Sequence, residues 1–137
     1  SRAGDVDRDL ESTERETMNI DTMEAGNDMD MLIAEKVMGW TELHLHRFGQ
    51  AGTFLVGDHD GKELCQVPHY STDIAAAWLV VDKIYIHTIR RIINDSPDSP
   101  ALWSAEIYYD DPGIGETVQL AICRVALKAA EIQRNNE

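Results

Sequence analysis

The spacing of apolar residues predicts three helices, over residues 28–39, 71–83 and 116–133. In each segment large apolar side chains recur three and four residues apart, which places them on one face of a helix. Ser71 or Thr72 is expected to cap the second helix. The second helix is expected to bury Ile74, Ala77, Trp78, Val81 and Ile84. The third is expected to bury Val118, Ala121, Ile122, Val125, Ala126 and Ala129.

Two stretches between the first and second helices predict a β-hairpin. In residues 40–56, leucines alternate with polar side chains, which is the period of a half-buried strand. The turn-forming sequence at residues 58–61 then joins residues 53–56 to residues 63–67.

Strand patterns also lie between the second and third helices. Residues 84–93 are rich in β-branched side chains and roughly alternating, which predicts a strand; continuation of the second helix to Ile93 is the alternative. Residues 94–100 are a loop, residues 102–109 a further strand, and residues 110–115, with one proline and two glycines, a turn. The predicted fold class is therefore α+β, with an antiparallel sheet of about four strands flanked by helices around one core.

Acidic residues are concentrated at the start of the chain. Residues 1–30 hold ten acidic residues and three arginines, in a protein whose formal net charge is −13. Because large apolar side chains are few before residue 28, this segment cannot bury enough surface to offset its ordering entropy. We therefore expect residues 1–27 to be an acidic, flexible tail and residues 28–137 to be a single domain.

Composition narrows the classes of function. A chain of 137 residues with this acidity repels phosphate backbones, so direct nucleic-acid binding is not expected. No apolar run approaches the roughly 20 residues that span a bilayer, and the first residues do not form a secretion signal. A cytoplasmic protein with no membrane partner is expected. Cys65 and Cys123 are expected to be core residues, because two cysteines make no disulfide framework here.

Three segments of the sequence resemble a known family. They are Ala34–Trp40 (AEKVMGW), Tyr70–Trp78 (YSTDIAAAW) and Glu116 followed by Leu120–Ala129. These segments resemble the opening, central and closing signatures of the phage ABA sandwich domain, in the same order and at the same spacing. The resemblance covers about residues 31–130 and implies an α/β/α sandwich carried by phages and prophages. It implies no particular activity, because the family's name describes a shape.

Two histidines and one acidic turn are candidate metal sites. His44 and His46 share one face of the predicted strand, a spacing that metal sites use. No HExxH or CxxC motif supports them, so we favour two surface histidines. Asp58 and Asp60 form part of a calcium-loop pattern whose other ligands are missing, and a hairpin turn is favoured. The sequence predicts no metal, no cofactor and no catalytic residue.

The candidate binding site is the start of the second helix together with nearby aromatic and basic side chains. Helix N–H groups and hydroxyls suit an anion or a ribose hydroxyl, aromatic rings stack on a base, and guanidinium groups clamp phosphates. The predicted ligand-binding residues are Trp40, Arg47, His69, Tyr70, Ser71, Thr72, Arg90, Arg91, Trp103 and Arg124. The alternative is a capped helix with tryptophans in the core and solvated arginines.

The expected function is that of a phage-encoded, non-enzymatic binding protein in the host bacterial cytoplasm. Its expected ligand is a host nucleotide immune signal, a cyclic ADP-ribose derivative or a cyclic dinucleotide, whose sequestration counters anti-phage defence. The alternatives are an enzyme that cleaves such a nucleotide, or a protein-binding or structural phage module that docks through its acidic tail. Because a domain this small buries limited core, we also expect a homo-oligomer, with spare apolar surface on Met29, Trp40, Trp103 and the last helix.

Overall fold

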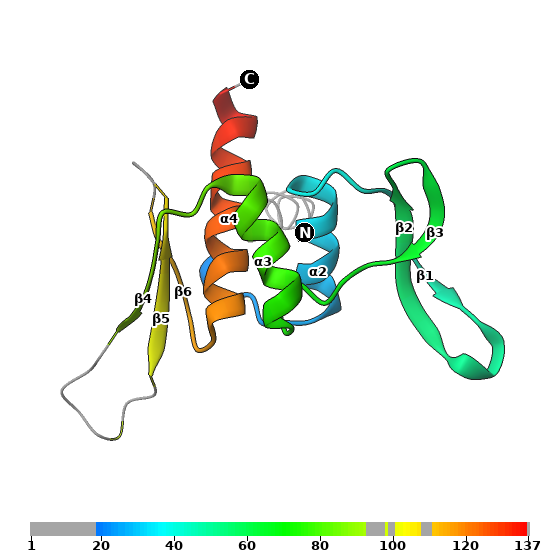
Figure 1. The fold of residues 1–137 in the computed structure, drawn as a ribbon, viewed down its shortest axis with the longest axis horizontal. Coiled ribbons are helices and arrows are strands. Elements are labelled where there is room, and N and C mark those ends of the chain that lie inside the picture. The colour runs from blue at the N-terminus through cyan, green and yellow to red at the C-terminus, as the bar shows by residue number, and fades with distance from the viewer. Residues whose placement is uncertain (1–18, 93–97, 99–100, 108–110, 137) are drawn as a thin grey trace, which may run out of the picture.

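Three helices lie between two small β-sheets in the computed structural model of the chain (Figure 1). The structure describes residues 19–92, 98, 101–107 and 111–136. The helices are α2 (Asn27–Lys36), α3 (Ile74–Ile84) and α4 (Val118–Asn136), and two short 3-10 helices are η1 (Asn19–Asp21) and η2 (Gly49–Ala51). The three helices predicted from the sequence are thus confirmed.

The strands form two antiparallel sheets of three strands each. The first has the order β1-β2-β3, with bounds Thr41–Arg47, Thr53–His59 and Lys62–Gln66. The second has the order β4-β5-β6, with bounds Thr88–Ile92, Leu102–Glu106 and Gly113–Gly115. The α+β class and the β2–β3 hairpin are confirmed. The expected single sheet of about four strands is corrected, because α3 intervenes between the two groups of strands and brings β4 to the other side of the helices.

Helix α4 is the centre of the core. It packs against α2, α3, η1, β5 and β6. Between Leu120 and Leu127 every side chain except Arg124 is buried. The sequence predicted burial of one face only, but a helix enclosed by neighbours on several sides buries most of its circumference.

Strand β6 occupies residues 113–115 of the segment 110–115 that was predicted to be a turn; residue 110 lies outside the described residues. Its two glycines allow its backbone to lie directly on α4: a Cβ on Gly113 would overlap the carbonyl oxygen of Ala121 and the backbone of Val125. A Cβ on Gly115 would crowd Leu120. The glycines therefore serve close packing of strand on helix rather than a turn.

Helix α3 buries only part of the predicted face: Ala77 is buried, and Val81 and Ile84 pack against the core. Its buried residues are Ala76, Ala77 and Val80, whereas Ile74 and Trp78 are 41% and 49% exposed. Small side chains let α3 approach α4 closely, and the larger ones then face outward. The cap is also corrected: the carboxylate of Asp73, not a hydroxyl of Ser71 or Thr72, accepts the Ala75 N–H at 3.1 Å.

The segment from residue 84 to residue 93 is a strand only in its second half. Helix α3 ends where Tyr85 takes a left-handed conformation, with φ of 57°, and its N–H donates to the Val81 carbonyl. Strand β4 begins three residues later at Thr88. The strand prediction is confirmed for Thr88–Ile92, and the continuous helix to Ile93 is wrong. The predicted loop at 94–100, apart from residue 98, lies outside the described residues, as does the end of the strand predicted for 102–109.

Part of the segment predicted to be a tail packs against the core. Ile20 in η1 is only 6% exposed and belongs to the core, and Met23 packs against that core. Lys128 on α4 forms an ion pair with Asp21. These contacts correct the prediction that residues 19–27 belong to a flexible tail. The segment has few apolar side chains, but an ion pair with α4 adds to their packing. Residues 1–18 lie outside the described residues.

Candidate functional site

A cavity of about 580 Å³ lies where the loop before α3, strand β6 and the start of α4 meet. The segment between η1 and α2 forms its remaining wall. Its lining residues are Thr22, Glu24, Ala25, Ser71, Thr72, Leu102, Ile114, Gly115, Glu116, Thr117, Gln119, Leu120 and Arg124. Three of these, Ser71, Thr72 and Arg124, were predicted from the sequence as ligand-binding residues.

Arg124 joins two walls of the cavity. Its Nη1 donates to the Ile114 carbonyl at 2.5 Å and its Nη2 to the Met23 carbonyl at 2.9 Å. Its buried Nε has no hydrogen-bond partner. Burial lowers the pKa of Arg124, and the nearby carboxylates of Asp21 and Glu116 oppose that change. Arg124 therefore fixes the cavity's shape and retains unused N–H donors, rather than being a freely swinging phosphate clamp.

The other polar groups of the cavity are mainly hydrogen-bond acceptors. The side-chain amide of Gln119 donates to the Thr72 carbonyl at 2.9 Å, which ties α4 to the loop before α3. Thr117 caps α4 by accepting the Leu120 N–H at 3.1 Å. The carboxylates of Glu24 and Glu116 also line the cavity. A ligand that offers hydroxyl or amine donors is thus complementary to much of this surface.

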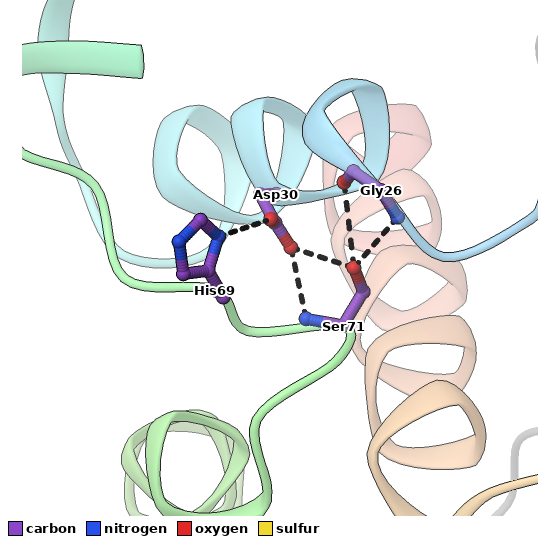
Figure 2. Close-up of polar contacts among 4 residues, drawn as sticks. All are labelled: Gly26, Asp30, His69 and Ser71. Atoms are coloured by element: carbon purple, nitrogen blue, oxygen red, sulfur yellow. Dashed lines mark hydrogen bonds and ion pairs between the residues drawn. The ribbon is translucent and has the colours of Figure 1, made fainter. Parts of the chain in front are cut away.

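A buried carboxylate holds one wall in place (Figure 2). Asp30, on α2, is 2% exposed, and its Oδ1 accepts both the Ser71 N–H at 2.8 Å and the Ser71 hydroxyl at 2.7 Å. The Ser71 Oγ also accepts the Gly26 N–H at 2.9 Å. His69 lies beside the other carboxylate oxygen, with Nδ1 3.6 Å from Oδ2. Ser71 is therefore committed to internal bonds and shapes the cavity without a free hydroxyl.

Two aromatic residues predicted to stack on a base are buried instead. Tyr70 is 1% exposed and Trp40 is 6% exposed. The Trp40 ring stacks on His59, with ring centroids 4.5 Å apart and planes within 2°. Burial raises the pKa of the Tyr70 hydroxyl, while the neighbouring Trp40 lowers it and the charge of Asp30 raises it further. As folded, neither ring presents a face to a ligand, so the prediction of a stacking platform is corrected for both.

The sequence comparison identifies the family. A model of the phage ABA sandwich domain matches residues 31–127, most of the chain. The chain belongs to the phage ABA sandwich family. Among solved structures, a phage protein from Bacillus cereus ATCC 14579 is 24% identical, over 74% of this chain and 88% of that one, with a TM-score of 0.48. The comparison with curated proteins finds no match.

The remaining candidate residues of this ABA sandwich protein lie apart. Arg47 ends β1, in the first sheet, whereas Arg90 and Arg91 lie on β4, in the second. Arg90 pairs with Glu106 at 3.4 Å. Trp103, on β5, packs against the core. None of these four residues lines the cavity, and Arg47 lies on a different sheet from Arg90 and Arg91, so these arginines do not converge with Arg124.

The histidines of the ABA sandwich protein also remain apart from the cavity. His44 and His46 contact each other edge to face, with centroids 5.7 Å apart, and His46 contacts Phe48. His69 is 58% exposed and faces Asp30 rather than the cavity. Across the described parts of the chain, no group of three or more His, Cys, Asp or Glu residues is placed to hold a metal ion. Nor does any described helix have the length and apolar character to cross a membrane.

Sequence reasoning missed Asp30, Gln119 and Glu24. Asp30 was counted among the acidic residues of the first 30 positions, and no local pattern shows that its carboxylate is buried. Gln119 lies in the first turn of α4, from which its side-chain amide reaches the loop before α3. No local pattern marks Glu24, because its place in the cavity depends on the path of the segment before α2.

Proposed function

We propose that this phage ABA sandwich protein is a non-enzymatic binding protein that sequesters a host nucleotide immune signal in the cavity at the start of α4. The observation that supports this proposal is that Ser71, Thr72 and Arg124 line one cavity of about 580 Å³. That volume lies within the range of small-molecule sites. The ligand class is a cyclic ADP-ribose derivative or a cyclic dinucleotide, held intact in the host cytoplasm.

The charges of the cavity give the proposed ligand a preferred orientation. Arg124 and the first N–H groups of α4 attract a phosphate. The carboxylates of Glu24 and Glu116 repel a phosphate but accept hydrogen bonds from ribose hydroxyls. A bound nucleotide therefore places one phosphate toward Arg124 and its ribose toward the two glutamates. Its other charged groups face the open mouth of the cavity.

A calorimetric titration tests this proposal. The purified protein is titrated with a panel of cyclic ADP-ribose derivatives and cyclic dinucleotides, and bound ligand is recovered after denaturation. Binding to at least one member, with the ligand recovered intact, is expected. Absence of heat and of a thermal shift across the whole panel contradicts the proposal, and recovery of a cleaved ligand replaces it with the enzyme alternative.

Two matched variants place the binding in the cavity. Thr72→Val removes one exposed hydroxyl from the cavity wall, so the dissociation constant should rise about five-fold, the effect of one neutral hydrogen bond. Thr53→Val makes the same change on β2, away from the cavity, and should leave the dissociation constant unchanged. Equal effects of the two variants would exclude this cavity as the site.

We also propose a homo-oligomer, but the apolar surface available for contact between copies differs from the one predicted from the sequence. Met29 and Trp40, expected to offer spare apolar surface, are 0% and 6% exposed. Among the residues that the structure describes, the exposed large apolar side chains lie elsewhere: Leu45, Phe48, Leu64, Ile74, Trp78, Leu79, Tyr85 and Ile114. Light scattering at the monomer mass in dilute solution would contradict the expected dimer.

A further inference from the structure

A second hollow, farther along α4 toward its C-terminal end, has a different character from the cavity above. It measures about 520 Å³ and lies between α2, α4 and η1. We call it the α2–α4 groove. Its floor consists of apolar side chains: Ile20, Met23, Met31, Leu32 and Leu127. It shares no lining residue with the cavity at the start of α4.

The rim of the α2–α4 groove is acidic. Its charged residues are Asp28, Glu35, Lys36 and Glu131. The Lys36 Nζ lies 3.0 Å from the Glu131 Oε1, so these two charges neutralise each other. Asp28 and Glu35 remain. They are two helical turns apart on α2, about 10 Å along its axis, and therefore point to the same side.

The shape of the groove suits a helix. Two helices packed side by side, here α2 and α4, present a furrow into which a third amphipathic helix can lay its apolar face. Methionines at Met23 and Met31 adapt their flexible side chains to an incoming surface. Partners bound in this way anchor through apolar residues at i, i+3, i+4 and i+7.

Charge decides which helix fits. We propose that the α2–α4 groove binds a basic amphipathic helix of another protein, with apolar side chains on the groove floor and Lys or Arg facing Asp28 and Glu35. The charge of this chain's own sequence matches that rim poorly. Its residues 1–18 hold six acidic residues and three arginines, and a second copy carries a net charge of −13. Either would bring like charge to an acidic rim.

A designed peptide tests the inference on the full chain. The probe is a fluorescent peptide of about 18 residues, built from Leu and Lys, with Leu on one face and Lys seven residues apart beside it. The first control permutes the same residues so that Leu covers no single face, and the second replaces Lys with Glu. Saturable binding of the probe is expected, with binding of both controls at least about ten-fold weaker. Equal binding of the permuted or the acidic peptide overturns the proposal.

Variants of the protein locate the peptide. Asp28→Asn with Glu35→Gln removes the two free rim charges and should weaken probe binding about five-fold at low ionic strength. Glu63→Gln with Asp82→Asn makes the same change of net charge at exposed positions on β3 and α3, and should leave probe binding unchanged. Equal weakening by both pairs of substitutions overturns the proposal. Displacement of the probe by an unlabelled peptide of residues 1–18 also overturns it, because the occupant is then this chain's own segment.

Discussion

The two sheets of the molecule are stabilised in different ways. Sheet β4-β5-β6 lies against α4, with the β6 backbone in direct contact with the helix. Sheet β1-β2-β3 projects away from the helices (Figure 1), and no residue of β1 is buried. The cavity lies at the junction of β6 and α4, in the region of the sheet β4-β5-β6. A site built on the closely packed region keeps its shape when empty, whereas the projecting sheet meets the core through a few side chains, among them Leu55 and Leu43.

The largest loss of stability is expected from a substitution where β6 touches α4. Gly113→Ala places a methyl group against the backbone of α4, which cannot move aside, and should lower the free energy of unfolding by about 3 kcal/mol. Gly57→Ala, in β2, meets chiefly the flexible end of Leu43 and the Thr41 carbonyl, and should cost about 1 kcal/mol. Urea unfolding of both variants measures the difference. Equal losses would contradict the contrast between the two sheets.

The next largest loss of stability is expected from substitution of Asp30, whose buried carboxylate lies behind the cavity. Asp30→Ala removes the acceptor of the Ser71 N–H and hydroxyl, leaving both donors buried, and should cost about 2–3 kcal/mol of unfolding free energy. Asp30→Asn keeps an oxygen in place of Oδ1 and should recover most of that stability. The same urea unfolding measures both. If the two variants are equally unstable, the negative charge rather than the hydrogen bonds holds the loop before α3.

The helix positions and the buried face of α4 could be predicted from the sequence, but the face that α3 buries could be predicted only in part. The apolar periodicity of α3 is the same whether Trp78 or Ala77 and Val80 face the core. The choice depends on α4, whose central position allows only small side chains to come close. The Asp30–Ser71 bonds join residues 41 positions apart, and no local pattern encodes such a pair. Ser71, Thr72 and Arg124 were found because a helix start and an arginine are recognisable locally.

The two cysteines should differ in thiol reactivity, because one lies on the central helix α4 and the other on the projecting sheet. Cys123, on α4, is 0% exposed, and burial raises the pKa of its thiol far above the ordinary 9.0, with the charge of Asp30 adding to the rise. Cys65, on β3, is partly exposed. At pH 8 a thiol reagent should modify Cys65 in the native protein and Cys123 only on unfolding. Comparable native-state rates at both cysteines would contradict the tight packing of α4.

Alkaline pH provides a smaller test of the same packing. Because the pKa of the Tyr70 hydroxyl and of the Cys123 thiol are raised on folding, the folded protein retains both protons to higher pH than the unfolded chain does. Their contribution to stability is fully present below the ordinary values of 9.0 and 10.0 and falls as the pH rises beyond them. Tyr70→Phe should flatten this decline between pH 9 and 11 in thermal unfolding curves. An unchanged slope would contradict the burial of the hydroxyl.

The most direct test of the proposed function is a nuclear magnetic resonance titration of the ¹⁵N-labelled protein with the nucleotide that gives heat in calorimetry. The account predicts that amide signals of Thr72, Gly115 and Gln119, which line the cavity, shift with the titration. Signals of β1, β2 and β3 should stay in place, because that sheet lies away from the cavity. Shifts confined to β1–β3, or no shift with any nucleotide of the panel, would contradict the account.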